Sequence, residues 1–146
     1  MTQTAWAHLP NAKHIDWVIA SVKAHPKKWV AARDAAWAAA YDAAYDAAYT
    51  AAWNAAELAA WRMAGKVLYD AAWTAVGDAV GDAAREAAKC ALLALVAYDD
   101  CAYMVESDID EIKILAKLGD QRAILLLPAC IVFNETKVKI CPNLLV

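Results

Sequence analysis

A four-residue pattern of large, polar and small residues runs without interruption along residues 29–92. Its sixteen tetrads read large-polar-Ala-Ala, and the third and fourth positions are Ala at 26 of 32 places. Alanine is the best helix former, and the chain holds no proline between Pro26 and Pro128. The pattern therefore predicts helical structure throughout these residues.

The period of the pattern restricts how these helices can pack. An α-helix turns about 100° per residue, so four residues overshoot a full turn by about 40°. The seam of alanines therefore drifts around a straight helix, and the large first position drifts with it. We expect that the aromatic side chains of this position cannot all face one core: Trp37, Tyr41, Tyr45, Tyr49, Trp53 and Trp61.

One straight helix over the whole repeat is too long for a compact protein of this size. Such a helix would span about 96 Å, whereas a compact chain of this length has a radius of gyration of about 15 Å. The pattern weakens at residues 61–68, where Gly65 could end one helix and Asp70 could begin the next. We therefore predict a reversal near residues 64–70, and we expect first-position glycines to face the aromatic side chains of a neighbouring helix.

The chain outside the tetrads predicts further helices. Asn11 is placed to cap a helix over residues 12–24, and Ser107 or Asp108 is placed to cap a helix over residues 109–118. Asp120 is placed to cap a helix over residues 121–132, which Pro128 bends or ends. An extended segment is expected at residues 136–140.

These features together predict a single all-α domain over residues 1–146, a bundle of about five or six helices packed closely through Ala. Residues 29–92 form its tetrad-repeat region, and residues 93–146 form an amphipathic helical tail with an extended C-terminus.

Composition and charge narrow the classes of function. The chain is 62% hydrophobic, largely because 38 of its 146 residues are Ala, and its net charge is -3. This charge argues against binding of double-stranded nucleic acid through bulk basicity. No stretch of the sequence resembles a membrane span, and residues 1–10 lack the basic and apolar regions of a signal peptide. We expect a cytoplasmic protein without membrane contact.

The sequence lacks the motifs of the common enzyme chemistries. It contains no nucleophile elbow and no HExxH metal motif, and its four glycines form no phosphate-binding loop. The four cysteines lack metal-site spacing, which favours buried thiols over disulfides or a metal site. We expect a protein that is not an enzyme and that uses neither cofactor nor metal.

The first candidate binding feature is a basic stretch at the predicted start of a helix. It comprises Lys27, Lys28, Trp29, Arg33 and Trp37. Basic side chains beside the N–H groups of a helix start can hold an anion, and an aromatic ring can stack on a base. The alternative is that the two lysines are solvated surface charges.

The second candidate is the later part of the aromatic column. Trp53 and Trp61 lie near Arg62 and Lys66 in the sequence, and aromatic rings beside cations can hold a nucleotide. Alternatively, these rings fill the spaces between Ala-faced helices or form the interface of a homo-oligomer.

The third candidate is a pair of acids within an apolar segment, Asp99 and Asp100. A carboxylate in a core needs a partner, so we expect either a polar core pair or a ligand contact. Arg33, Arg62 and Arg85 are the expected partners in a structural pair, unless the acids lie at a helix end.

Three segments carry a resemblance to a known group of proteins. They read AAYDAAYDAAYTAAW, LALVAYDDCAYMVESD and LAKLGDQRAILLLPA, with Leu9-Pro10-Asn11-Ala12 upstream. The chain resembles uncharacterised Ala-rich tetrad-repeat proteins of phage and bacterial genomes. The group has no established activity, so no functional residue carries over. The resemblance implies a phage accessory protein, a class that often binds host or defence components, including by sequestering nucleotide signals.

We therefore expect a non-enzymatic binding protein, a phage counter-defence protein that sequesters an anionic small molecule such as a nucleotide signal in the host cytoplasm. The alternatives are a protein-interaction module that inhibits a host protein and an oligomeric structural scaffold. The expected partners are accordingly a nucleotide-like ligand or a host protein, and further copies of the chain in a homo-oligomer.

Overall fold

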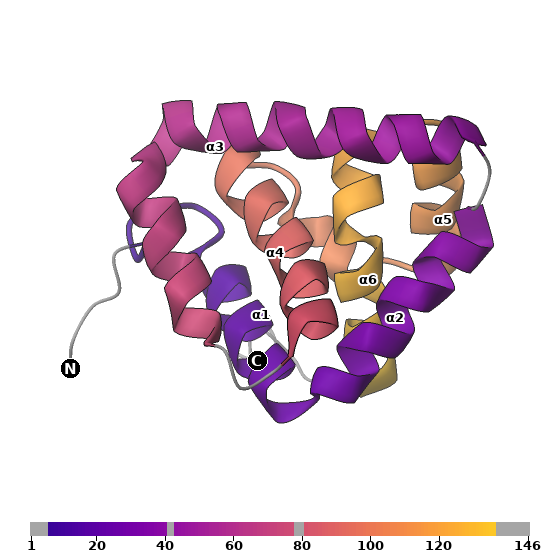
Figure 1. Ribbon diagram of the computed structural model, residues 1–146, viewed down its shortest axis with the longest axis horizontal. Coiled ribbons are helices and arrows are strands. Elements are labelled where there is room, and N and C mark those ends of the chain that lie inside the picture. The colour runs from indigo at the N-terminus through magenta and orange to yellow at the C-terminus, as the bar shows by residue number, and fades with distance from the viewer. Residues whose placement is uncertain (1–5, 41–42, 78–80, 137–146) are drawn as a thin grey trace, which may run out of the picture.

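The protein folds as a bundle of helices around one core (Figure 1). A computed structural model describes residues 6–40, 43–77 and 81–136, without the side chains of residues 39–40, 43–46, 61, 63–69 and 71–72. The elements are α1 (Ala12–Ala24), α2 (Pro26–Ala40), α3 (Ala43–Val76), α4 (Asp82–Ala97), the short 3₁₀ helix η1 (Ala102–Glu106), α5 (Ile109–Lys117) and α6 (Gln121–Thr136). The prediction of an all-α fold is confirmed, and within the described residues no strand forms.

Two helices, α4 and α6, lie side by side in the centre of the bundle (Figure 1). Residues 90–97 of α4 and 123–132 of α6 are buried without interruption. A helix that is apolar on all sides is stable only when other elements surround it, because each face must be removed from water. The outer helices α1, α2 and α3 all contact α4 and supply that cover.

The fourth position of the tetrad faces the core in all three helices that the repeat forms. It is half-buried at Ala48 and buried at every other described tetrad: Ala32, Ala36, Ala52, Ala56, Ala60, Val76, Ala84, Ala88 and Leu92. A small side chain on the core side lets neighbouring helices approach closely. Where its side chains are described, the first position is half-buried, apart from Trp29, which is buried, and Gly81, which is exposed.

Changes in helix direction compensate for the drift of the alanine positions around the helix. Helix α2 ends at Ala40 and α3 ends at Val76, the helix that follows each of them runs in a new direction, and α3 itself bends around the core (Figure 1). These changes of direction keep the fourth position of the tetrad toward the core. The third position still shows the drift, because it is exposed at residues 31–51, half-buried at 55–83, and buried at 87 and 91 wherever it is described.

The reversal predicted at residues 64–70 is wrong, because α3 continues through this segment. The turn between α3 and α4 begins and ends at glycines with left-handed backbone conformation, Gly77 at φ 81° and Gly81 at φ 87°. Glycine adopts this conformation without the steric cost that a Cβ atom brings. These two glycines therefore form the turn and do not serve as packing sites for aromatic rings.

The predicted starts of three other helices agree with the structure: α1 at residue 12, α5 at residue 109 and α6 at residue 121. The α1 prediction, residues 12–24, is confirmed. In α5 the carboxylate of Asp108 accepts the N–H of Asp110 at 2.8 Å, and before α6 the carboxylate of Asp120 accepts the N–H groups of Arg122 and Ala123. These bonds satisfy amides that have no partner inside the helix.

Helix α6 is longer than the sequence predicts. It passes through Pro128 and ends at Thr136, whereas the prediction ended it at residue 132. Phe133 in this extra turn packs edge-on against Trp17 with ring centroids 5.8 Å apart, a contact that stabilises the helix beyond Pro128. The predicted extended segment at 136–140 lies outside the described residues, apart from Thr136, which is helical.

Candidate functional site

First-position side chains of α3 and α4 meet around a hollow of about 300 Å³. Trp53 and Trp73 come from α3, and Arg85 and Lys89 come from α4. The Nζ atom of Lys89 lies 5.2 Å from the centroid of the Trp53 ring and 4.9 Å from that of Trp73. The Cζ atom of Arg85 lies 4.9 Å from the Trp73 centroid. With Asp82 and Glu86, these residues define the α3–α4 groove.

The groove continues toward α2 through Glu86. This residue also lines a second hollow of about 370 Å³ with Arg33, Asp34 and Trp37, and its Oε2 atom accepts from Nη1 of Arg33 at 3.2 Å. Three aromatic rings of α2 and α3 also lie close together. Ring centroids lie 5.2 Å apart between Trp37 and Tyr49 and 6.3 Å apart between Tyr49 and Trp53. Residues of all three repeat helices therefore contribute to one aromatic and charged surface.

Positive and negative charges balance on this surface. It carries three basic and three acidic side chains: Arg33, Arg85, Lys89, Asp34, Asp82 and Glu86. Asp82, the acid 3.9 Å from Arg85, is fully exposed, and the Glu86 side chain is half-exposed. Exposed ion pairs contribute about 0–1 kcal/mol. A ligand that carries a phosphate group can therefore replace these carboxylates at little cost.

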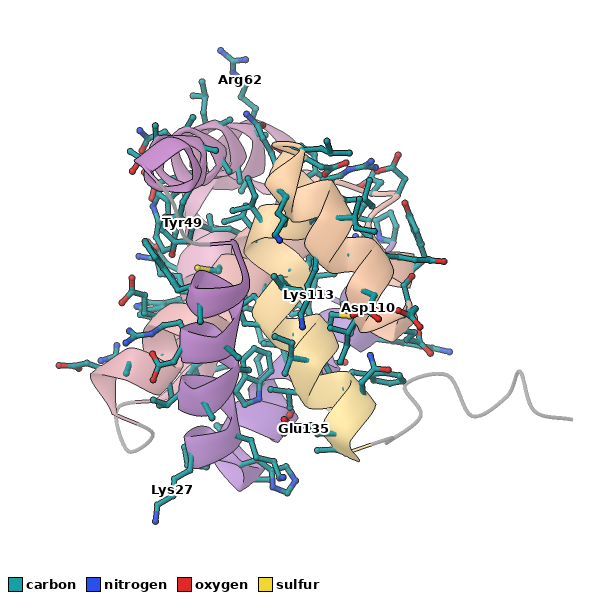
Figure 2. All side chains as sticks on the ribbon, turned by 90° about the vertical axis from the view of Figure 1, so that its right-hand side faces the viewer. Lys27, Tyr49, Arg62, Asp110, Lys113 and Glu135 are labelled. Atoms are coloured by element: carbon teal, nitrogen blue, oxygen red, sulfur yellow. The ribbon has the colours of Figure 1, made fainter. Side chains whose placement is uncertain are left out.

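The predicted site at the start of α2 is not assembled as expected. Trp29 is fully buried, and its Nε1 donates to Oγ of Ser21 at 3.0 Å, so it is a core residue with no surface for a ligand. Nζ of Lys28 lies 3.8 Å from the carboxylate of Glu135 in α6. Lys27 is exposed in the first turn of α2 and projects away from the bundle (Figure 2). Sequence reasoning placed Trp29 on a surface because neighbouring tetrads look alike.

The second predicted cluster is divided by the fold. Trp53 lies in the α3–α4 groove. Arg62 is exposed on α3 and points away from the bundle (Figure 2), where it does not line the groove. The side chains of Trp61 and Lys66 lie outside the described residues. Trp53 is therefore the only member of this cluster that the described side chains place in the groove.

The two acids after α4 lie at the surface, not in a core. Asp99 and Asp100 are exposed in the turn after α4, which corrects the prediction of a polar core pair. Oδ1 of Asp100 accepts from Nη1 of Arg122 at 3.2 Å. Arg122 belongs to α6 and was not among the arginines considered from the sequence. Of the two structural alternatives, a pair in the core and a helix end, the structure supports the helix end. A ligand contact at Asp99 or Asp100 stays a prediction.

Of the six groove residues, only Trp53 was a binding candidate from the sequence. Three of the five that were missed are the second indole and the two cations: Trp73, Arg85 and Lys89. All three occupy the first position of a tetrad, the same column as Trp53. Membership of the first position of the tetrad was therefore the sequence feature that could have identified these residues. Which members of this column meet depends on the reversal at residues 77–81, and the sequence-based prediction put that reversal elsewhere.

Three cysteines have buried thiols that are not in disulfides: Cys90, Cys101 and Cys130. This confirms the expected buried thiols for these residues, and Cys141 lies outside the described part of the chain. Burial raises the pKa of each thiol to about 12. In Cys90, which follows Lys89 in α4, the Sγ atom lies 2.9 Å from the hydroxyl oxygen of Tyr49, a contact that lowers the thiol pKa but does not outweigh burial.

We predict that these three thiols react slowly with iodoacetamide in the folded protein. The thiolate is the nucleophile, and a pKa near 12 leaves only a trace of it at pH 8. Mass spectrometry of peptides after timed labelling would report each cysteine separately, and labelling in urea gives the accessible reference. Labelling of Cys90 at the same rate in folded and unfolded protein would contradict its burial.

The described residues show neither a metal site nor a membrane span. No three His, Cys, Asp or Glu side chains among them are grouped to hold a metal ion. In the same part of the chain, no helix combines the length and the apolar character needed to cross a membrane.

Comparison with known protein families, with curated proteins and with solved structures found no match for this chain. The resemblance to phage tetrad-repeat proteins therefore stays an expectation.

Proposed function

We propose that the protein is a non-enzymatic binding protein that holds a planar anionic small molecule of the nucleotide class in the α3–α4 groove. One observation carries the proposal: Arg85 and Lys89 lie over the indole rings of Trp53 and Trp73 around a single hollow. A nucleotide needs both components, because its phosphates seek cations and its base stacks on flat rings. The hollow, at about 300 Å³, is at the lower end of the range for small-molecule sites.

Binding would exchange existing ion pairs for contacts to the ligand. A phosphate replaces Asp82 beside Arg85 and takes up hydrogen bonds from Lys89. The base then stacks on an indole or on the flat guanidinium of Arg85. Charge-assisted hydrogen bonds are worth about 1.5–3 kcal/mol each, more than the exposed pairs that they replace.

Sequestration is the biological role that fits such a binder. The groove combines stacking surfaces with balanced charges, an arrangement suited to holding a ligand. The resemblance to phage accessory proteins supports a counter-defence role in the host cytoplasm, where removal of a nucleotide signal has an effect without any chemistry.

The test is binding of nucleotides to the purified protein. We expect a member of a panel of mono-, di- and cyclic nucleotides to raise Tm and to quench Trp fluorescence. Arg85→Ala with Lys89→Ala should weaken binding by about tenfold per side chain, since each removes one charge-assisted contact. Isothermal titration calorimetry would give the Kd of each variant.

A matched control is Lys27→Ala with Lys28→Ala, which removes the same charge outside the groove. This variant should bind like the wild type. Equal weakening by both double variants would show that net charge, and not the groove, governs binding. Absence of a Tm shift across the whole panel would refute the proposal.

A further inference from the structure

The outer side of α5 exposes apolar side chains that no described element covers. Ile114 is 59% exposed and Leu118, the residue after the helix, is 78% exposed, and they lie one turn apart. Helix α5 packs on α6 and α2 on its other side, through Ile112 and Ala116. Helix α5 lies at the right of Figure 1, and Figure 2 shows it beside α6 with Asp110 and Lys113 labelled.

Helix geometry makes Ile114 the centre of this surface. It lies two residues, or about 200°, from the buried Ile112, and so points almost directly outward. Asp110 and Lys117 are seven residues apart and therefore lie on nearly the same line along the helix. With Glu111 and Leu118, which are also exposed, these residues define the α5 outer face.

The charges of this face are arranged so that it complements itself. Asp110 lies in the first turn of α5 and Lys117 in the last, on either side of Ile114. Neither takes part in any ion pair described for this structure, although Arg33, Arg85 and Arg122 do. If two copies of α5 run antiparallel about a twofold axis near Ile114, each Asp110 meets the partner's Lys117. The two Ile114 side chains then cover each other.

We infer that the α5 outer face is the contact between two copies of this chain in a twofold dimer. Isologous dimers require a surface that complements itself, and this one does so in charge and in apolar character. The inference does not depend on the α3–α4 groove. Helix α5 has nine residues and is about 13.5 Å long, so the buried area is small. Interfaces of that size are weak and transient, and the dimer should form only at high protein concentration.

Charge reversal tests this arrangement directly. In a dimer of the Asp110→Lys variant, both contacts between positions 110 and 117 join two lysines. In a dimer of the Lys117→Asp variant, both of these contacts join two aspartates. Each variant alone should dimerise about tenfold more weakly than the wild type in sedimentation equilibrium up to millimolar concentration. An equimolar mixture of the two variants should recover association, because every contact in the mixed dimer again joins opposite charges.

Ile114→Ser provides a second, uncharged variant and should also reduce association. Circular dichroism melts of all variants would confirm that they are folded, which is expected because the altered side chains are exposed. A wild type that stays monomeric up to millimolar concentration would overturn the inference. So would single charge variants that associate like the wild type, or a mixture that shows no recovery.

Discussion

Replacing Trp29 with Ala is expected to lower the free energy of unfolding by about 3–5 kcal/mol. Trp29 is fully buried and packs against Trp17 with ring centroids 5.9 Å apart. The change removes this ring from the core, leaves a cavity and takes the hydrogen-bond partner from Ser21. A domain of this size loses roughly 2–4 °C in Tm per kcal/mol, so Tm should fall by about 10 °C or more.

The matched control is Trp37→Ala, in the same column two tetrads further along. Trp37 is half-buried at the edge of the core, so its removal should cost less than half as much. Urea unfolding followed by circular dichroism at 222 nm would give both values. Equal losses would mean that the two tryptophans occupy equivalent positions, contrary to the structure.

This pair of substitutions separates what the repeat encodes from what the fold decides. The first position of the tetrad predicts an aromatic or charged side chain at the edge of the core, and Trp37 and Trp53 behave in this way. Trp29 has the same position in the repeat, but it lies at the start of α2 beside α1, where Trp17 and Ser21 enclose it. The burial of Trp29 depends on the angle between α1 and α2, and the tetrad pattern does not predict that angle.

Helix ends were predictable where one side chain or backbone conformation sets them. Asp108 and Asp120 cap the helices that follow them, and Gly119, at φ 89°, ends α5. These are local effects within a few residues. The reversal between α3 and α4 was misplaced because Gly65 and Gly77 carry the same local signal. Packing of α3 across α4 selects Gly77, and that packing is a long-range property.

The candidate groove illustrates the same limit. The sequence showed that tryptophans and basic residues share one column, and three of its candidates, Trp53, Arg33 and Trp37, line the two hollows. It did not show that Lys89 lies over Trp53, which is 36 positions earlier. That contact requires the turn at Gly77 and Gly81 to fold α4 back along α3.

Asn11→Asp is expected to destabilise the protein by about 3–5 kcal/mol at neutral pH. Asn11 is 3% exposed, and its Nδ2 donates to the carbonyl oxygens of Leu95 at 2.9 Å and Tyr98 at 2.8 Å. The sequence assigned Asn11 to the start of α1, but its side chain makes no cap there and instead satisfies carbonyls at the end of α4. Aspartate has nearly the same shape, yet it places a buried negative charge against two carbonyl oxygens at the negative end of a helix.

The pH dependence identifies the cause of this loss. Burial beside two acceptors raises the pKa of the introduced carboxyl above its usual value of about 3.9. The protonated form can donate one hydrogen bond, so the variant is closest to the wild type below pH 4 and loses stability as pH rises through the raised pKa. Asn11→Ala is the control: it removes both bonds without adding charge, and its cost of about 1–3 kcal/mol should not change with pH. The measurement is the free energy of unfolding of the wild type and both variants between pH 4 and pH 8. If the difference in this free energy between Asn11→Asp and Asn11→Ala stays constant over this range, a buried carboxylate is not the cause of the lost stability.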